Sequence, residues 1–216
     1  MKYKIDLHTH SNFSFDGGIH LEQYRQFLDD KKLDFVAVTD HNLLHNALVI
    51  HDTLGSRIIA GEEIKSQGGD IIGLYLTQEI KPGLSVKQTV EEIKVQGGLV
   101  YIPHPFDSRR SGLSRINLDS IIEDVDIIET YNARFLGRKG NQQAFEYNRD
   151  YGKPAAAGSD AHGVSEIGKT YSVVNQIPLK ENLCELLQIA SYKKKLVSPR
   201  GFFNPTINRI RHKIRR

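Results

Sequence analysis

The sequence predicts an α/β fold in which a parallel sheet closes into a barrel with helices outside it. The chain of 216 residues alternates short apolar runs with polar or amphipathic stretches, which is the rhythm of strands and helices in a parallel sheet. Seven or eight such units occupy a length that suits one large domain. So many units in one domain favour a closed barrel over an open sheet.

Most of the expected strands are short continuous apolar runs, as parallel strands buried on both faces require. They cover residues 3–8, 35–39, 57–60, 71–76, 99–102, 127–130, 155–158 and 170–174. Helices are expected between them, over residues 21–31, 85–96, 118–122, 140–150 and 179–190. The second of these helices ends at Gly97 and Gly98, because glycine commonly terminates a helix.

Metal-ligand side chains stand at the ends of the expected strands. His8 and His10 are two residues apart at the end of the first strand, so their imidazoles point to the same side. Other strands end in Asp40-His41, Glu62-Glu63, His104, Glu129 and Asp160-Ala161-His162, whereas the fourth begins at Asp70. Because the carboxyl ends of barrel strands meet at one rim, these side chains are expected in a single metal site.

The types of ligand indicate which metals the site takes. The set contains no thiolate, and mixed imidazole and carboxylate ligands suit Zn²⁺, Mn²⁺ or Fe²⁺. About nine ligands are too many for one ion, so two or three ions bridged by a carboxylate are expected. A cluster of that kind activates a bridging water and clamps the oxygens of a phosphate ester.

The motifs along the chain resemble those of the PHP (polymerase and histidinol phosphatase) domain over residues 3 to about 175. They are Asp6-Leu7-His8-Thr9-His10, Ser14-Phe15-Asp16-Gly17, Val38-Thr39-Asp40-His41-Asn42, Gly61-Glu62-Glu63-Ile64, His104-Pro105-Phe106-Asp107 and Gly158-Ser159-Asp160-Ala161-His162. The resemblance implies a distorted (β/α)7, TIM-like barrel with a metal cluster that hydrolyses phosphate esters.

The resemblance also implies which residues bind each ion. The first ion would be held by His8, His10, Glu63 and Asp160. Glu63 would bridge to a second ion, which His104 also binds. The third ion would be held by Asp16, His41 and His162. Asp70 departs from the family pattern, which often has histidine there, and would serve the second ion through oxygen; Glu129 is a candidate additional ligand there, with a structural role as the alternative.

Three arginines are the candidate phosphate ligands, because a guanidinium matches two phosphate oxygens. They are Arg109, Arg110 and Arg134, each with a solvated loop charge as the alternative. In the mechanism we expect, a metal-bridging hydroxide attacks phosphorus, Asp40 orients the site, and His162 or a water protonates the leaving oxygen.

The expected substrate is a small phosphomonoester, either histidinol-phosphate-like or a nucleotide 3′-phosphate. One alternative is a phosphodiesterase or exonuclease that acts on oligonucleotide ends. A second is hydrolysis of a non-phosphate bond by the same metal cluster, which the arginines disfavour. A third is a non-catalytic PHP module that acts through a basic tail.

That tail follows a mildly acidic body. Residues 1–190 carry 20 basic and 26 acidic side chains, whereas residues 191–216 carry nine basic ones and no acidic one. We therefore expect a barrel domain over 1–190 and a basic extension over 191–216. A helix over 206–216 would place Ile207, Ile210 and Ile214 on one face. That face would dock on the barrel, lie on acidic lipid, or accompany a nucleic-acid contact.

The chain is expected in the cytoplasm. Its amino-terminus shows no signal peptide, and no apolar run reaches the ~18 residues that a membrane span needs. The single cysteine, Cys184, cannot form an internal disulfide, which suits a reducing compartment. The oligomeric state is not indicated by any feature of the sequence.

Overall fold

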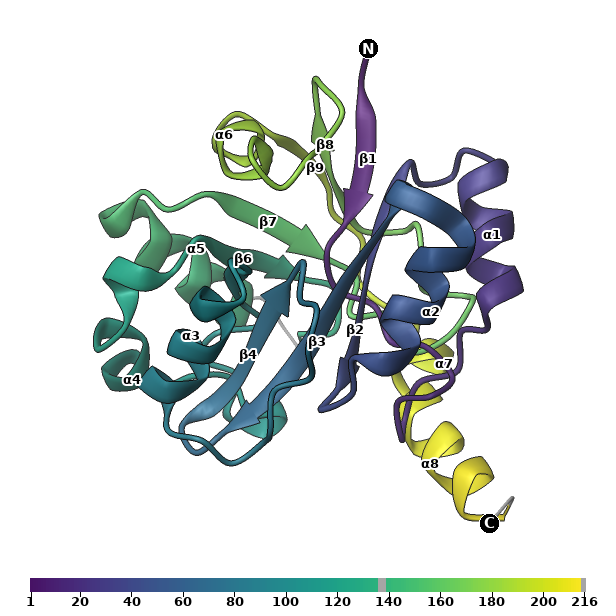
Figure 1. Ribbon diagram of the computed structural model, residues 1–216, viewed down its shortest axis with the longest axis horizontal. Helices are drawn as coiled ribbons and strands as arrows, with labels where there is room; N and C mark the ends of the chain where they lie inside the picture. The colour runs from purple at the N-terminus through teal and green to yellow at the C-terminus, as the bar shows by residue number, and fades with distance from the viewer. Residues whose placement is uncertain (136–138, 215–216) are drawn as a thin grey trace.

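The computed structural model describes residues 1–135 and 139–214 (Figure 1). Within these residues, nine strands form one sheet in the order β7-β6-β5-β4-β3-β2-β1-β8-β9. The strands are β1 (Tyr3–Asp6), β2 (Phe35–His41), β3 (Ile58–Ser66), β4 (Gly69–Leu74), β5 (Leu99–Ile102), β6 (Ile127–Asn132), β7 (Ala155–Gly158), β8 (Tyr171–Val174) and β9 (Ser191–Lys193).

The sheet is mixed, so the expectation that every strand is parallel is wrong at two places. β4 is antiparallel to β3 and β5, and β8 is antiparallel to β1 and β9. Only Gln67 and Gly68 separate β3 from β4, and two residues suffice for a hairpin but not for a parallel crossover. As a result β4 begins, rather than ends, at the edge of the sheet where the neighbouring β3 ends.

The sheet curls into a nearly closed, TIM-like barrel, which confirms the predicted fold class. Its seam lies between β7 and the pair β8 and β9. There the Ala157 amide donates to Ser172 Oγ at 3.0 Å, and the Tyr192 hydroxyl donates to the Ala155 carbonyl at 3.1 Å. Side chains therefore bridge the seam, where no backbone ladder joins β7 to β8.

The helices lie around the sheet (Figure 1). They are α1 (Leu21–Asp29), α2 (His45–Leu54), α3 (Val86–Val95), α4 (Arg115–Asp119), α5 (Lys139–Tyr151), α6 (Leu183–Gln188), α7 (Pro199–Phe202) and α8 (Asn204–Ile214), with short 3-10 turns at Gly55–Arg57, Ser108–Arg110 and Ile122–Asp124. α2 was not expected from the sequence, α4 begins three residues earlier than expected, and α6 is shorter than expected. α3 begins with a capping box between Ser85 and Gln88, which fixes its first turn.

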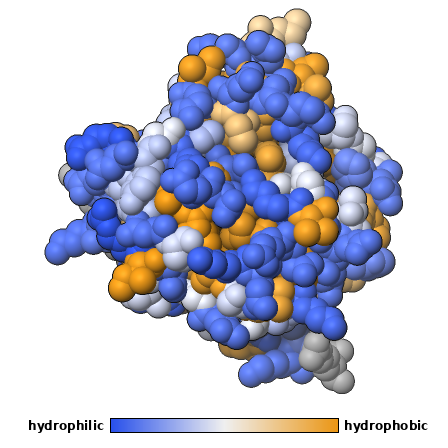
Figure 2. Space-filling view, turned by 60° about the vertical axis from the view of Figure 1, so that its left-hand side comes forward, coloured by the Kyte–Doolittle hydropathy of each residue, from blue (hydrophilic) through white to orange (hydrophobic). Residues whose placement is uncertain are grey.

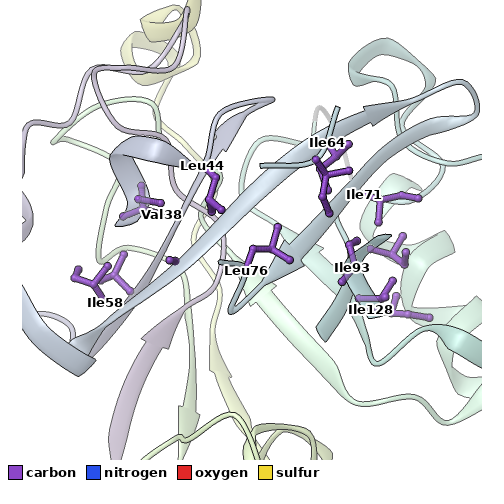
Figure 3. Packing of buried hydrophobic residues seen from close by; sticks show 14 of the residues in the cluster. Val38, Leu44, Ile58, Ile64, Ile71, Leu76, Ile93 and Ile128 are labelled. Atoms are coloured by element: carbon purple, nitrogen blue, oxygen red, sulfur yellow. The ribbon is translucent and has the colours of Figure 1, made fainter. Parts of the chain in front are cut away.

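Two apolar clusters lie on opposite faces of the strands, because side chains alternate along a strand. Phe35 and Ala37 of β2 belong to the inner cluster. Val36 and Val38 belong to the outer cluster, which packs under the helices. Figure 3 shows members of the outer cluster, among them Val38, Leu44, Ile58, Ile64, Ile71, Leu76, Ile93 and Ile128.

α6 contributes three leucines to the inner cluster and lies near the amino-terminal end of β1 (Figure 1). It therefore covers the end of the barrel opposite the rim at which β1 ends. The face in Figure 2 is mostly hydrophilic, with apolar residues gathered toward the middle of the view. None of the helices that the structure describes is both long and apolar enough to cross a membrane.

The predicted tail helix forms, but it does not dock through its isoleucines. Ile207, Ile210 and Ile214 are 39, 54 and 78 % exposed, whereas Asn208 is buried. α8 begins at Asn204 and projects from the body of the molecule (Figure 1). The last two residues of the expected helix, 215 and 216, lie outside the described residues. α8 therefore contacts the rest of the molecule through polar side chains, and the spacing of apolar residues could not predict that contact.

Candidate metal centre

The barrel's inward side chains lead directly to the predicted ligands. Along β2 and β3, the register that buries Ala37 and Ile59 in the inner cluster also directs His41 and Glu63 inward, four residues further on. β4 runs the other way, so Asp70, two residues before the inner Ile72, lies at the same rim. Because side chains alternate along each strand, the ligand residues at one end of the barrel point inward like the apolar residues that precede or follow them.

The amino-terminal histidines are joined to the last motif by backbone pairing. The Asp160 amide donates to the His8 carbonyl and the His10 amide donates to the Ala161 carbonyl, both at 2.9 Å. This short parallel pairing sets His8 and His10 beside Asp160 and His162. Asp160 has a left-handed backbone with φ of 51°, a conformation that few non-glycine residues adopt.

The nine predicted ligands form overlapping groups of donors, and all of them except the fully buried His8 and His10 line one cavity. Within each group one ligand atom from every member lies within 4.8 Å of the others. The groups are His10, Asp16, His41 and His162; His8, His10 and Glu63; His8, His104 and Asp160; and Glu63, Asp70 and His104. The cavity has a volume of about 510 Å³, within the usual range for small-molecule sites.

Glu63 occupies the centre of these groups. Its Oε1 lies 3.0 Å from His104 Nε2, and its Oε2 lies 3.3 Å from both His8 Nε2 and His10 Nε2. His41 Nδ1 is 3.2 Å from the same Oε2. A carboxylate placed between several imidazoles in this way would suit a ligand that helps to hold more than one ion.

The donor set fits divalent cations. His8 Nε2 and His10 Nε2 are only 3.2 Å apart and fully buried, which a shared cation between them would satisfy. Burial would raise the pKa of Glu63, but His41 and His8 hold that pKa well below its usual value. Burial and the nearby His162 lower the pKa of His10. These directions favour an ionised Glu63 and a neutral His10, which are the forms that bind metal. Burial would lower the pKa of His8, but the carboxylates around it raise that pKa well above its usual value, so metal binding at His8 would release a proton.

The predicted additional ligand, Glu129, lies behind His8 rather than among the converging donors. Its Oε1 accepts from Tyr101 Oη at 2.7 Å and lies 3.1 Å from His8 Nδ1. Its Oε2 accepts from the His104 amide at 2.6 Å and from Asn132 Nδ2 at 2.8 Å. A carboxylate on the far nitrogen of a ligand histidine fixes the ring and its tautomer.

Asp40 lies outside the four donor groups as well. One of its oxygens accepts from the Ser11 amide at 2.6 Å and the other from Ser11 Oγ at 2.5 Å. Burial raises the pKa of Asp40 to about 6. Its contacts hold the chain immediately after His10.

The three predicted arginines occupy different environments at the cavity. Arg110 is the most engaged with the centre, since its Nη1 donates to Asp160 Oδ2 at 2.5 Å and its Nε to Asp107 Oδ2 at 2.9 Å. Its buried Nη2 meets no acceptor in the described part of the chain. Arg109 lines the same cavity with a side chain that is 58 % exposed.

Arg134 also lines the cavity, but its guanidinium is occupied by the protein. It lies 3.1 Å from Glu166 Oε2 and donates to the Phe202 carbonyl at 3.0 Å. Glu166 in turn accepts from the His162 amide at 2.7 Å. Arg134 therefore connects the His162 loop to the carboxyl-terminal segment.

Several residues of the site were missed by the sequence reasoning. Glu166, Asn208 and Arg209 contact the ligand-bearing loops, yet none lies in a recognised motif. Asn208 donates to the carbonyls of Asp16 and His162, both at 2.9 Å. Asparagines at 204 and 208 share a helix face, because they are four residues apart. This spacing is the feature of the sequence that could have predicted a polar contact between the helix and the site.

The chain is similar in sequence to known proteins. A family model described as PHP-associated matches residues 138–189. The uncharacterized protein MJ0417 of Methanocaldococcus jannaschii is 33 % identical over 182 residues, which are 82 % of this chain and 73 % of that protein. A second protein of that organism, MJ1587, is 35 % identical over 144 residues, or 60 % of this chain and 82 % of its own length.

Solved structures share the fold at low identity. A two-domain protein from Bacteroides vulgatus, containing a predicted PHP-like metal-dependent phosphoesterase, has a TM-score of 0.71 at 17 % identity over 97 % of this chain and 70 % of its own. The lesion-specific endonuclease Q from Pyrococcus furiosus has a TM-score of 0.62 at 15 % identity over 89 % of this chain and 57 % of its own. With the motifs, the barrel and these relatives taken together, the chain belongs to the PHP family.

Proposed function

We propose that this protein is a metal-dependent phosphoric ester hydrolase that acts on a small phosphomonoester. The observation that carries the proposal is the convergence of four His, Asp and Glu donor groups in one cavity beside Arg110, a guanidinium with an unpartnered buried nitrogen. Divalent Mn, Zn or Fe ions, two or three in number, would supply an activated water and neutralise phosphate charge there. His8, His10, Asp16, His41, Glu63, Asp70, His104, Asp160 and His162 would hold them.

The protein's own residues have separable roles in this proposal. Arg110 binds a phosphate oxygen with its guanidinium, which Asp160 and Asp107 hold in place. Glu129 positions His8, and Asp40 positions the chain after His10. The Nδ1 of His162 lies 2.8 Å from the Asp160 carbonyl. A proton on that nitrogen leaves Nε2 to face Asp16 at 3.6 Å. With no proton of its own Nε2 would be a metal ligand, whereas in the doubly protonated ring Nε2–H would be the group that passes a proton to the leaving oxygen.

A second candidate function is cleavage at the end of an oligonucleotide. It is favoured by the ring of Phe15, which is 50 % exposed and lines the cavity, because exposed aromatic rings stack on bases. One structural neighbour, endonuclease Q, forms a complex with a 27-mer duplex. Histidinol-phosphate-like compounds and nucleotide 3′-phosphates remain the first substrates to try.

The test is a screen of phosphomonoesters and short oligonucleotides against the Mn²⁺-loaded protein, with variants His8→Ala and Asp160→Ala. Both variants should lose turnover while keeping the circular dichroism spectrum of the wild type. His45→Ala is the matched control, because His45 is exposed on α2. Near-full activity of either site variant would contradict the proposal, and an inactive wild type with bound metal would favour the non-catalytic module.

A further inference from the structure

The carboxyl-terminal segment forms one wall of the metal cavity. Four of its residues line the same cavity as His41, Glu63 and Asp160, namely Phe202, Pro205, Thr206 and Arg209. This segment lies outside every motif of the metal centre. The wall therefore brings side chains to the site that the motifs do not specify.

Two asparagines fix α8 to the loops that carry metal ligands. Asn208 bonds the carbonyls of Asp16 and His162 with a single Nδ2, so it ties one loop to the other. Asn204 Nδ2 donates to Glu166 Oε1 at 2.5 Å, and Glu166 holds the His162 amide. The helix is thus positioned relative to the donor group that contains Asp16 and His162.

Glycines allow this close approach. A Cβ atom on Gly18 would lie 2.8 Å from Asn208 Nδ2, and one on Gly163 would lie 2.5 Å from Asn204 Nδ2. Either distance is shorter than carbon and nitrogen tolerate without displacement. The loops and the helix therefore fit one another closely at both ends of the contact.

Arg209 stands at the mouth of the cavity on this fixed helix. Its Nη2 lies 3.1 Å from Asp16 Oδ2, and its guanidinium lies over the Phe15 ring at 5.0 Å. The side chain is 54 % exposed, so it retains donors that face solvent and the cavity. Because a guanidinium carries five N–H donors, one contact with Asp16 leaves several for an anion.

We propose that Arg209 is a phosphate-binding residue that the carboxyl-terminal helix supplies to the metal centre. The inference deepens the proposed phosphoesterase function and rests on it. Arg110 approaches the centre at Asp160, and Arg209 approaches it at Asp16. When a divalent ion is bound by Asp16, Arg209 offers its donors to an oxygen of the phosphate that the ion also attracts.

The experiment measures inorganic phosphate binding to the Mn²⁺-loaded full-length chain by calorimetry, with Mn²⁺ content determined on the same samples. Arg209→Ala should weaken phosphate binding about 10- to 100-fold, as expected for loss of a charge-assisted hydrogen bond, with Mn²⁺ content unchanged. Arg209→Lys should recover part of the loss. Arg211→Ala is the matched control, because it removes an exposed arginine from the same helix and should leave binding unchanged.

Three results would overturn the inference. They are a wild type that binds no phosphate, an Arg209→Ala variant that binds it as tightly as the wild type does, and a variant that loses Mn²⁺. The last result would assign Arg209 to holding Asp16 instead. If phosphate binding depends on Arg209 but the wild type hydrolyses no phosphoester, the proposed function fails while this inference stands.

Discussion

Glu129→Gln is the most informative single substitution, because it alters one atom of a buried carboxylate that has four polar neighbours. The carboxamide can take two orientations. With its NH₂ at the Oε2 position it meets two donors, the His104 amide and Asn132 Nδ2, so this orientation is unfavourable. With its NH₂ at the Oε1 position it faces Tyr101 Oη and His8 Nδ1. The second orientation is therefore expected.

In that orientation the variant alters His8. Either the His8 Nδ1–H loses its acceptor, or the proton moves to Nε2, the nitrogen that faces Glu63 at 3.3 Å and would bind metal. Loss of such a partner typically weakens metal binding about 10- to 100-fold, or about 1.4–2.7 kcal/mol.

The assay is calorimetric titration of the metal-free protein with Mn²⁺. Glu62→Gln is the matched control, since Glu62 is also buried but its contact is with the Ile80 amide at 3.0 Å. We expect the control to bind Mn²⁺ as the wild type does. Equal Mn²⁺ affinity for Glu129→Gln and the wild type would refute the positioning role of Glu129.

The remaining predictions concern stability and reactivity. Burial would raise the pKa of Asp107, but Arg110 lowers it, so its stabilising contribution is present at neutral pH and lost as the pH falls through the folded-state pKa. Asp107→Asn should therefore lower the free energy of unfolding, measured in urea, by about 1–2 kcal/mol at pH 7. The difference in unfolding free energy between wild type and variant should become smaller below pH 4, and a difference that does not change with pH would contradict this. Burial raises the pKa of the Cys184 thiol to about 11, so iodoacetamide at pH 8 should alkylate it at least about tenfold more slowly than free cysteine. Alkylation at the rate of free cysteine, followed by mass spectrometry, would contradict this. Ile93→Ala removes a fully buried side chain and should cost about 2–5 kcal/mol in the same urea assay, whereas Val95→Ala, at an 86 % exposed position of the same helix, should cost under about 0.5 kcal/mol.

The sequence was most informative about the strands and the metal ligands. Continuous apolar runs predicted strands that form the barrel, and the His, Asp and Glu side chains after them predicted which residues meet in the cavity. The structure brings all nine predicted ligands into the overlapping donor groups. Asp70 was assigned to the site by the family resemblance, and the antiparallel direction of β4 explains how a residue at the start of a strand reaches the same rim.

The features that were missed depend on contacts that a local pattern does not encode. The hairpin between β3 and β4 reverses one strand, and its short connection was not recognised as a turn. α8 docks through Asn204 and Asn208, so the isoleucine periodicity of the tail indicated the wrong face. Arg209 was therefore counted only as one charge of a basic tail, although it lies 3.1 Å from a predicted ligand.

The metal content of the purified protein tests the central claim most directly. The protein is loaded with Mn²⁺ or Zn²⁺, freed of excess metal by gel filtration, and analysed by inductively coupled plasma mass spectrometry against protein concentration. We predict two or three ions per chain, with a clear loss in His8→Ala. Fewer than one ion per chain after loading would contradict the assignment of these side chains to a metal centre.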